Sequence, residues 1–228
     1  MISVIIPVYN EEKNIASLVT YLKLHGGSLL QEIIVCDAAS TDETKEVATK
    51  AGATVVVSPK KGRGAQLNYG ASKASGSVFY FVHADVFPPP SFATDIQKAV
   101  ADGYGLGRYR TTFNTRKWYV QMMSFFSRFD WFACYGGDQT LFVTRELFVT
   151  TGGYRRDMRV MEDYEFVERA RQQSQYKIFA AGALISDRKY DKNSWWKVQT
   201  ANRTMMLMYK NGASQEEMAA LYKRLLNW

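Results

Sequence analysis

Short unbroken runs of apolar residues recur along the first half of the chain. Runs rich in β-branched and aromatic residues are typical of strands that are buried on both faces. Four such runs are predicted to be strands, at 2–8, 32–36, 55–57 and 78–82. Between these runs, apolar residues repeat every three or four positions, which predicts helices. Because strands alternate with helices, we predict an α/β fold with a mostly parallel wound sheet and flanking helices.

Polar residues predict where two of the helices in this half begin. Asn10 is followed by Glu11 and Glu12, so it could cap a helix whose first turn is acidic. The stretch Ser40-Thr41-Asp42-Glu43 has the spacing of a capping box. We therefore expect one helix to start directly after Asn10 and another directly after Ser40.

The second half of the chain is less regular. We predict extended segments at 104–113, 140–143 and 176–185, with Arg108 and Arg110 on one face of the first. Helices are predicted at 115–129, at 145–150 and from about 161 onward. The helix at 115–129 carries a stripe of large apolar residues. Packing against the core or against another helix is a simpler explanation of this stripe than a platform for an acceptor.

Two amphipathic helices are predicted at the C-terminal end, over 191–228. We expect residues 1–190 to form the main domain, in two halves of about 1–102 and 103–190. A capping box at Ser214-Gln215-Glu216-Glu217 predicts the start of the last helix. Trp195, Trp196 and Trp228 could place these helices on a membrane surface, and packing against the domain is an equally economical explanation.

Composition indicates which kind of ligand the chain binds and in which cellular compartment it works. The chain has 228 residues and a formal net charge of +7, which favours an anionic ligand or surface. Two cysteines provide neither a disulfide framework nor metal-site spacing, and they fit a reducing compartment. No signal peptide or membrane-spanning run is evident in the sequence. We expect a cytoplasmic protein, and the C-terminal helices could bring it to the inner face of the membrane.

Candidate chemistry follows the strand at 78–82. Ligands of open parallel sheets bind just beyond the carboxyl ends of the strands, and His83-Ala84-Asp85 occupies that position here. In an extended chain the side chains of His83 and Asp85 lie on the same side. An imidazole and a carboxylate placed in this way can hold a divalent cation. The alternative is that Asp85 caps the helix that follows Pro88-Pro89-Pro90.

A basic loop precedes the helix predicted at 66–74. It contains Lys60, Lys61 and Arg63 together with two glycines. Such a loop can bind phosphate through its charges and its backbone N–H groups. Taken by itself, the loop is better explained as a solvated basic turn.

Five stretches occur in an order that matches a known family. They are SVIIPVYNEE at 3–12, EIIVCDAASTD at 32–42, GRGAQLNYGA at 62–71, His83-Ala84-Asp85, and Gly152-Gly153-Tyr154 followed by Glu162-Asp163. Together they resemble the family 2 glycosyltransferases, which are inverting enzymes of the GT-A fold. The similarity is greatest to short bacterial members with His-Ala-Asp in place of the metal-binding Asp-x-Asp. It also implies a role in cell envelope polysaccharide or glycolipid synthesis.

The resemblance implies that a nucleotide-activated sugar lies across the carboxyl ends of the first strands. The substrate-binding positions are then Pro7, Tyr9, Glu11, Asp37, Arg63, Gln66, Asn68, His83, Ala84 and Arg188. Asp37 would lie near the nucleoside. Arg63 and Arg188 would hold the diphosphate, although Arg188 is equally well explained as a solvated cation. Asp85, with His83, would hold Mn²⁺ or Mg²⁺ on the diphosphate.

The family match implies that Asp163 is the base that deprotonates an acceptor hydroxyl, with Glu162 as its support. Adjacent residues at a helix start point in different directions. We therefore expect one carboxylate to face the cleft, and the other to cap the helix or meet Arg155, Arg156 or Arg159. The alternative is that the pair serves only as a helix cap.

Departures from the family pattern affect the expected ligands. Ala38 replaces a second acid at the end of the second strand, which leaves open whether the donor is UDP- or GDP-linked. His83 replaces a carboxylate, which favours Mn²⁺ over Mg²⁺. The Gln-x-x-Arg-Trp signature of processive members is not evident, so we expect transfer of single sugars.

Functions of other classes fit less well. A dinucleotide-dependent oxidoreductase would need G-x-G-x-x-G after its first strand, where this chain has Pro7-Val8-Tyr9-Asn10. We find no nucleic-acid recognition motif and expect no nucleic-acid partner. The remaining alternative is a non-catalytic nucleotide-sugar-binding module on the same scaffold.

Overall fold

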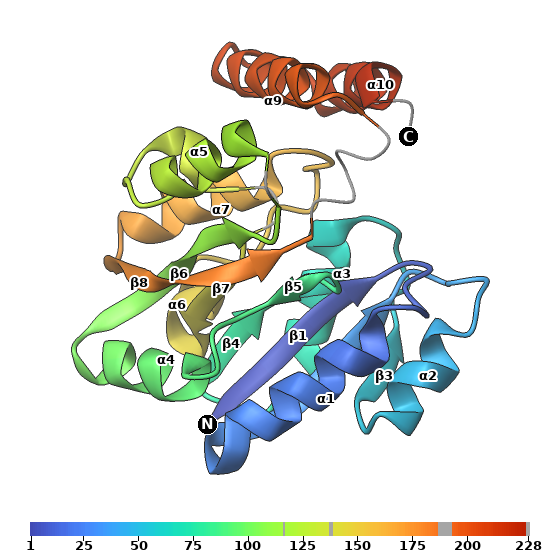
Figure 1. Cartoon of the computed structure of the whole chain (residues 1–228), viewed down its shortest axis with the longest axis vertical. Coiled ribbons are helices and arrows are strands. Elements are labelled where there is room, and N and C mark those ends of the chain that lie inside the picture. The colour runs from blue at the N-terminus through green and yellow to red at the C-terminus, as the bar shows by residue number, and fades with distance from the viewer. Residues whose placement is uncertain (116, 137–138, 187–192, 227–228) are drawn as a thin grey trace.

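One eight-stranded sheet forms the centre of the molecule. The computed structural model describes residues 1–115, 117–136, 139–186 and 193–226. The strand order is β3-β2-β1-β4-β7-β6-β8-β5 (Figure 1). The strands are β1 Ile2–Val8, β2 Leu30–Asp37, β3 Thr54–Val57, β4 Val78–Phe81, β5 Val86–Phe87, β6 Tyr104–Phe113, β7 Leu141–Thr144 and β8 Gln175–Ile185. The predicted α/β class is confirmed, and β5 is an additional two-residue strand.

The first four strands of the order are parallel, as the βαβ winding predicts. β1 pairs in parallel with β2 and with β4, and β2 pairs in parallel with β3. β7 is antiparallel to both β4 and β6, while β6 and β8 are parallel. The chain therefore places the carboxyl ends of β1, β2 and β4 at one edge, where a ligand can approach.

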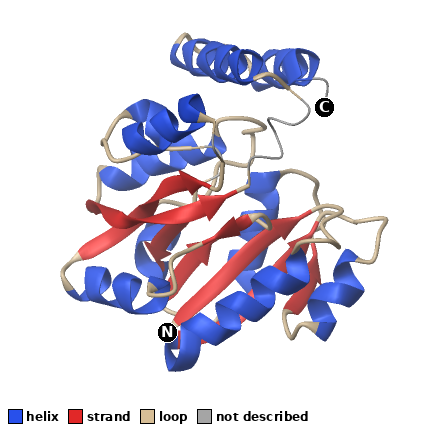
Figure 2. Ribbon diagram, in the orientation of Figure 1, coloured by secondary structure: helices blue, strands red, loops and turns tan. Residues whose placement is uncertain are grey.

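Helices cover both faces of the sheet (Figure 2). They are α1 Ile15–Gly26, α2 Thr44–Lys50, α3 Arg63–Lys73, α4 Phe92–Ala101, α5 Trp118–Phe126, α6 Arg145–Thr150, α7 Glu162–Arg171, α9 Trp195–Lys210 and α10 Gln215–Leu226, with short 3-10 turns at Gly27–Leu29 and Phe132–Cys134. In β4, Val78 and Tyr80 join the core on the α1 and α4 side. Phe79 and Phe81 join the core beneath α3, α6 and α7. Both faces of β4 are therefore buried, which explains its unbroken apolar run.

The predicted caps near the start of the chain are wrong. α1 begins at Ile15 and α2 begins at Thr44. Asn10 has a φ of 55°, and its side-chain oxygen accepts a hydrogen bond from Thr41 N at 2.9 Å. Ser40 Oγ in turn accepts from Asn10 N at 2.9 Å. These polar side chains therefore join two loops to each other instead of capping helices.

The capping box predicted for the last helix is confirmed. Glu217 N donates to Ser214 Oγ at 3.2 Å, and Ser214 N donates to Glu217 Oε2 at 3.3 Å. Each residue of the pair satisfies a backbone N–H of the other, which is the reciprocal arrangement that the motif requires.

The predicted packing of the apolar stripe on α5 is confirmed for Tyr119 and Met123, which lie against the core, and is wrong for the exposed Trp118, Met122, Phe125 and Phe126. Val120 is the residue of α5 that is fully buried, whereas Trp118 is 73% exposed and Phe125 is 48% exposed. α5 is also shorter than the predicted helix, and it lies beside α9 (Figure 1). Trp195 of α9 donates its Nε1–H to the sulfur of Met123 at 3.2 Å.

The C-terminal helices pack against the chain segment that precedes α7. Met205 of α9 and Met218 of α10 form a buried cluster with Met161. Gln215 Oε1 accepts hydrogen bonds from Arg159 N at 2.8 Å and Val160 N at 3.1 Å. Across the described residues, none of the helices combines the length and the apolar character needed to cross a membrane.

Candidate active site

The loops at the carboxyl edge of the sheet hold unusual backbone conformations. Asn10 follows β1, Ala39 follows β2 and Met161 precedes α7, with φ angles of 55°, 62° and 66°. Positive φ is uncommon outside glycine, and such residues cluster where surrounding structure enforces a functional geometry. Three loops with constrained backbone therefore lie at the edge of the sheet where a ligand is expected.

Asp37 is completely buried at the end of β2. Its carboxylate accepts hydrogen bonds from Ser40 N at 2.9 and 3.2 Å and from the Ser40 hydroxyl. These bonds close the turn that contains Ala39. Asp37, which the family resemblance places near the nucleoside, therefore shapes the loop that follows β2.

Gln66 joins the ends of the first two strands. This α3 residue is 6% exposed, and its Nε2 donates to Val8 O at 2.9 Å and to Cys36 O at 2.7 Å. The amide therefore spaces β1 and β2 at the edge that carries Asp37. Burial also raises the pKa of the neighbouring Cys36 thiol to about 11.

Asn68 fastens a distant loop to α3. Its Nδ2 donates to Tyr154 O at 2.7 Å, and its Oδ1 accepts from Tyr154 N at 2.9 Å. The preceding residue, Gly153, has a φ of 68°, and a Cβ there would lie 2.6 Å from Asn68 Oδ1. Glycine is therefore required at 153 both by conformation and by space.

Arg63 holds the acidic pair at the start of α7. Its Nε donates to Glu162 Oε1 at 2.5 Å, and its Nη2 lies 3.5 Å from Asp163 Oδ2. The Glu162 side chain is 3% exposed and that of Asp163 is 15% exposed. Burial, reinforced by the charges of the two carboxylates, raises the pKa of the adjacent Tyr154 well above its usual value.

The prediction that a nearby arginine of the 155–159 loop meets the acidic pair is wrong. Arg155 pairs with Asp157, and Arg159 pairs with Glu216. The cation that meets Glu162 is Arg63, which lies 99 residues away in the sequence. Arg63 therefore contacts the acidic pair, and the buried Glu162 leaves Asp163 as the carboxylate with more access to a substrate.

His83, Ala84 and Asp85 follow the end of β4 after one residue, Val82. Ala84 is buried, whereas His83 and Asp85 are partly exposed. The Asp85 carbonyl accepts from Ser186 N at 3.2 Å, which fixes this segment beside the end of β8. Within the described ranges, no group of three or more His, Cys, Asp or Glu residues could hold a metal ion. His83 and Asp85 still suit Mn²⁺ or Mg²⁺ if a bound diphosphate and water supply the remaining ligands.

The remaining predicted positions surround the end of β1. Pro7 is partly buried, and Tyr9 is 52% exposed with the Lys61 ammonium 5.7 Å from the centre of its ring. Glu11 Oε2 accepts from Asn14 Nδ2 at 2.7 Å. Arg188 lies outside the described residues.

The contacts that three residues make at this edge were not predicted from the sequence. Asn10 and Ser40 connect the loops after β1 and β2, and Tyr154 provides the backbone groups that Asn68 holds. Asn10 and Ser40 stand next to predicted strand ends. That position, together with their polar side chains, was the available signal for a loop-to-loop contact.

Comparisons with known proteins agree with this architecture. Residues 3–161 match the family described as "Glycosyl transferase family 2". Glucosyl-3-phosphoglycerate synthase from Mycolicibacterium smegmatis is 38% identical over 96 residues, which cover 39% of this chain and 32% of that protein. The chain thus spans about a third of the length of this curated relative.

Two solved structures share the fold at low sequence identity. One is glucosyl-3-phosphoglycerate synthase from Mycobacterium tuberculosis in complex with Mg²⁺ and UDP, with a TM-score of 0.67, 19% identity and coverage of 93% of this chain and 80% of that one. The other is a mannosyltransferase from Pyrobaculum calidifontis in complex with GDP-Man and Mn²⁺, with a TM-score of 0.66 and 18% identity. The match covers 91% of this chain and 61% of that one. The strand order, the helices on both faces and the match over residues 3–161 lead to one assignment: this chain belongs to glycosyl transferase family 2, and its fold is of the GT-A type.

Proposed function

We propose that the chain transfers a single sugar from a UDP- or GDP-linked donor to an acceptor hydroxyl, with inversion at the anomeric carbon. The observation that carries this proposal is the position of α3. Its residue Gln66 bonds to the ends of β1 and β2, Asn68 bonds to Tyr154, and Arg63 bonds to Glu162. One helix therefore connects the strand ends where the donor would lie to the carboxylates that would meet the acceptor.

Asp163 is proposed as the general base. Its side chain is more exposed than that of Glu162, so it has the better access to a hydroxyl group. A hydroxyl is a weak nucleophile, and a positioned carboxylate that accepts its proton makes attack on the anomeric carbon possible. The oxygen attacks opposite the bond to the nucleoside diphosphate. That single displacement breaks the bond and inverts the anomeric carbon.

His83 and Asp85 are the proposed metal-binding residues, and the metal supplies charge neutralisation on the departing diphosphate. Because an imidazole replaces a hard carboxylate, Mn²⁺ is favoured over Mg²⁺. Calorimetric titration of a nucleoside diphosphate with each metal and without metal tests this assignment. Equal affinity in all three conditions, with Asp85→Ala unchanged, would contradict it.

Measurements of sugar transfer and of donor affinity distinguish the roles of Glu162 and Asp163. The wild type is incubated with a panel of nucleotide sugars, Mn²⁺ and candidate acceptors, and the released nucleoside diphosphate is measured. Loss of a general base lowers the rate by about 10²–10⁴-fold, so Asp163→Asn is expected to lose transfer in that range while donor affinity is kept. Full transfer by Asp163→Asn with loss in Glu162→Gln would exchange the two roles. Full transfer in both variants would refute the mechanism.

We also propose that the protein acts in the cytoplasm and contacts the inner face of an anionic membrane. Both cysteines are free, which suits a reducing compartment. Trp196 of α9 is 75% exposed and Trp118 of α5 is 73% exposed, and the chain carries a net charge of +7. Exposed tryptophans on a basic protein favour the membrane interface.

Substitutions on the exposed surface test membrane contact without removing the helices that cover Met161. Trp118→Ser and Trp196→Ser are expected to reduce co-sedimentation with anionic vesicles. Val149→Ser is the matched control, because Val149 is 66% exposed on α6. Equal sedimentation of all these variants and the wild type would contradict membrane contact through α5 and α9.

A further inference from the structure

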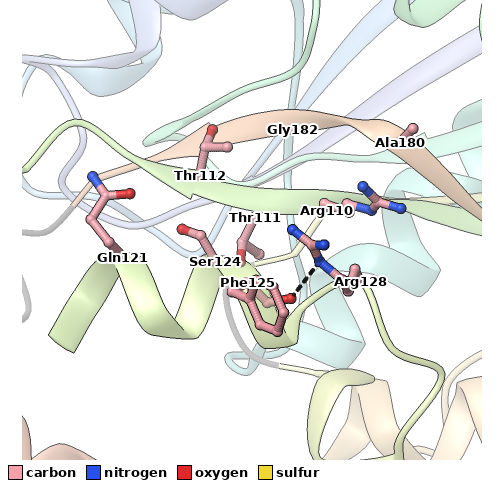
Figure 3. Close-up of a pocket in the computed structure, with 9 residues that line it drawn as sticks. All are labelled: Arg110, Thr111, Thr112, Gln121, Ser124, Phe125, Arg128, Ala180 and Gly182. Carbon is pink, nitrogen blue, oxygen red and sulfur yellow. Dashed lines mark hydrogen bonds between the residues drawn. The ribbon is translucent and has the colours of Figure 1, made fainter. Parts of the chain in front are cut away.

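A pocket of about 300 Å³ opens between α5 and the strands β6 and β8 (Figure 3). Arg110 and Thr112 of β6 line it, together with Gln121 and Ser124 of α5 and Arg128 just beyond α5. The pocket contains none of the residues that the proposed transfer reaction uses. Its polar groups therefore call for a separate explanation.

The two arginines of this pocket lack carboxylate partners among the described residues. Arg128 Nε donates to Phe125 O at 3.0 Å, and its guanidinium lies 4.0 Å from the centre of the Phe125 ring. Elsewhere in the described chain, arginines at 63, 155, 159, 169 and 171 each pair with a carboxylate, whereas those at 108 and 145 donate to backbone carbonyls. In the view of Figure 3, both guanidinium groups lie at the same end of the pocket. Two like charges that share a pocket without an acidic lining residue favour an anionic ligand.

Hydrogen-bonding capacity in the pocket is also unused. Arg110 Nε and Ser124 Oγ are buried and have no hydrogen-bond partner in the part of the chain that the structure describes. Buried polar groups normally have a partner, which a bound ligand or an ordered water can supply here. A ligand that draws these side chains toward it would recover the missing bonds.

The wall of the pocket is shaped by an irregularity in the sheet. The β6–β8 register shifts between Tyr109 and Arg110, whose partners are Phe179 and Gly182. Such bulges re-aim side chains and are frequent beside functional sites. A Cβ at Gly182 would lie 2.3 Å from Thr112 Cγ2, so the close approach of the strands requires glycine there.

We propose that this pocket binds the phosphate group of a small phosphomonoester. A phosphate dianion matches the two guanidinium charges, and guanidinium groups bind phosphate oxygens through paired, charge-assisted hydrogen bonds. A carboxylate would balance only one of the two arginines. The volume is at the lower end of the range for ligand pockets, which suits a short phosphorylated carbon chain better than a nucleotide.

Calorimetric titration of the full chain with glycerol 3-phosphate tests the proposal. Divalent metal is left out so that the proposed donor site does not compete. One ligand per chain is expected to bind, with acetate as the weaker carboxylate control. Arg110→Met and Arg128→Met are each expected to weaken binding about 10- to 100-fold, and Ser124→Ala about 3- to 10-fold.

Arg203→Met is the matched control, because it removes the same charge from an exposed position on α9. Circular dichroism confirms that each variant is folded, and Ser124→Ala tests the pocket without any change of charge. Absence of saturable binding up to about 10 mM, or equal affinity in the pocket variants and Arg203→Met, would overturn the proposal. Pocket-dependent binding only to phosphatidic acid vesicles would likewise overturn it in favour of a lipid headgroup. Neither outcome depends on whether the chain transfers a sugar.

Discussion

Removal of Arg63 is expected to destabilise the fold through the acidic pair that it holds. Arg63→Met keeps most of the side-chain length and deletes the charge. Glu162 then retains a buried carboxylate without its cation, since Glu162 is 3% exposed and bonds Arg63 at 2.5 Å. A buried charge that loses its partner is costly because burial has already removed most of its hydration.

The magnitude follows from the exposure of both partners. Breaking a fully buried pair costs about 3–5 kcal/mol. The Arg63 side chain is 35% exposed, so water partly compensates, and we expect the free energy of unfolding to fall by about 2–3 kcal/mol. For a chain of this size, each kcal/mol lowers Tm by about 2–4 °C, which gives a decrease of about 4–12 °C.

A double-mutant cycle measures this coupling directly. Urea unfolding is recorded for Arg63→Met, Glu162→Gln and the double variant, and the double variant is expected to lose about 1–3 kcal/mol less than the sum of the two. Arg155→Met is the control, because Arg155 and its partner Asp157 are 53% and 61% exposed. Additivity within about 0.5 kcal/mol, or an equal effect of Arg63→Met and Arg155→Met, would refute the reasoning.

Two further predictions concern groups near the same edge. Asn68→Ala removes both hydrogen bonds to Tyr154 and leaves buried backbone groups unpaired, so we expect the free energy of unfolding in urea to fall by about 2–4 kcal/mol. An unchanged free energy of unfolding would show that Asn68 does not hold this loop. Burial raises the pKa of both thiols, to about 11 for Cys36, but Cys36 is buried whereas Cys134 is partly exposed. An aromatic disulfide reagent is therefore expected to label Cys134 first, and faster labelling of Cys36 would contradict this.

The parts of the fold that could be predicted are those set by local composition. β4 is recognisable because neighbours on both faces bury every residue from Val78 to Phe81, so no polar residue interrupts it. His83 and Asp85 then mark the end of the strand, because they are the first polar residues after this apolar run. Because the His83-Ala84-Asp85 motif lies next to the end of β4, its position in the fold could be predicted from the sequence.

Contacts between distant segments could not be predicted in the same way. Arg63 and Glu162 are separated by 99 residues, and nothing in the sequence around either one selects the other. Arg155, Arg156 and Arg159 were the expected partners because they are close in sequence. In the folded chain, α3 and the start of α7 meet at the same edge, and this tertiary arrangement decides which cation reaches the buried carboxylate.

The helix at α5 shows a second limit of pattern analysis. Apolar periodicity indicates that a face avoids water, but it does not identify what covers that face. Trp118 and Phe125 are exposed in the folded chain, although their spacing is that of a buried stripe. The sequence therefore predicts the helix without predicting its surroundings.

The loop between Tyr154 and Met161 is held from two directions. From α3, Asn68 binds both backbone groups of Tyr154, and this contact lies within residues 3–161, the part that matches the family. From α10, Gln215 binds the backbone of Arg159 and Val160, and this contact comes from beyond the matched residues. The loop that leads to Asp163 is therefore held both by the part of the chain that matches the family and by a C-terminal helix beyond that part.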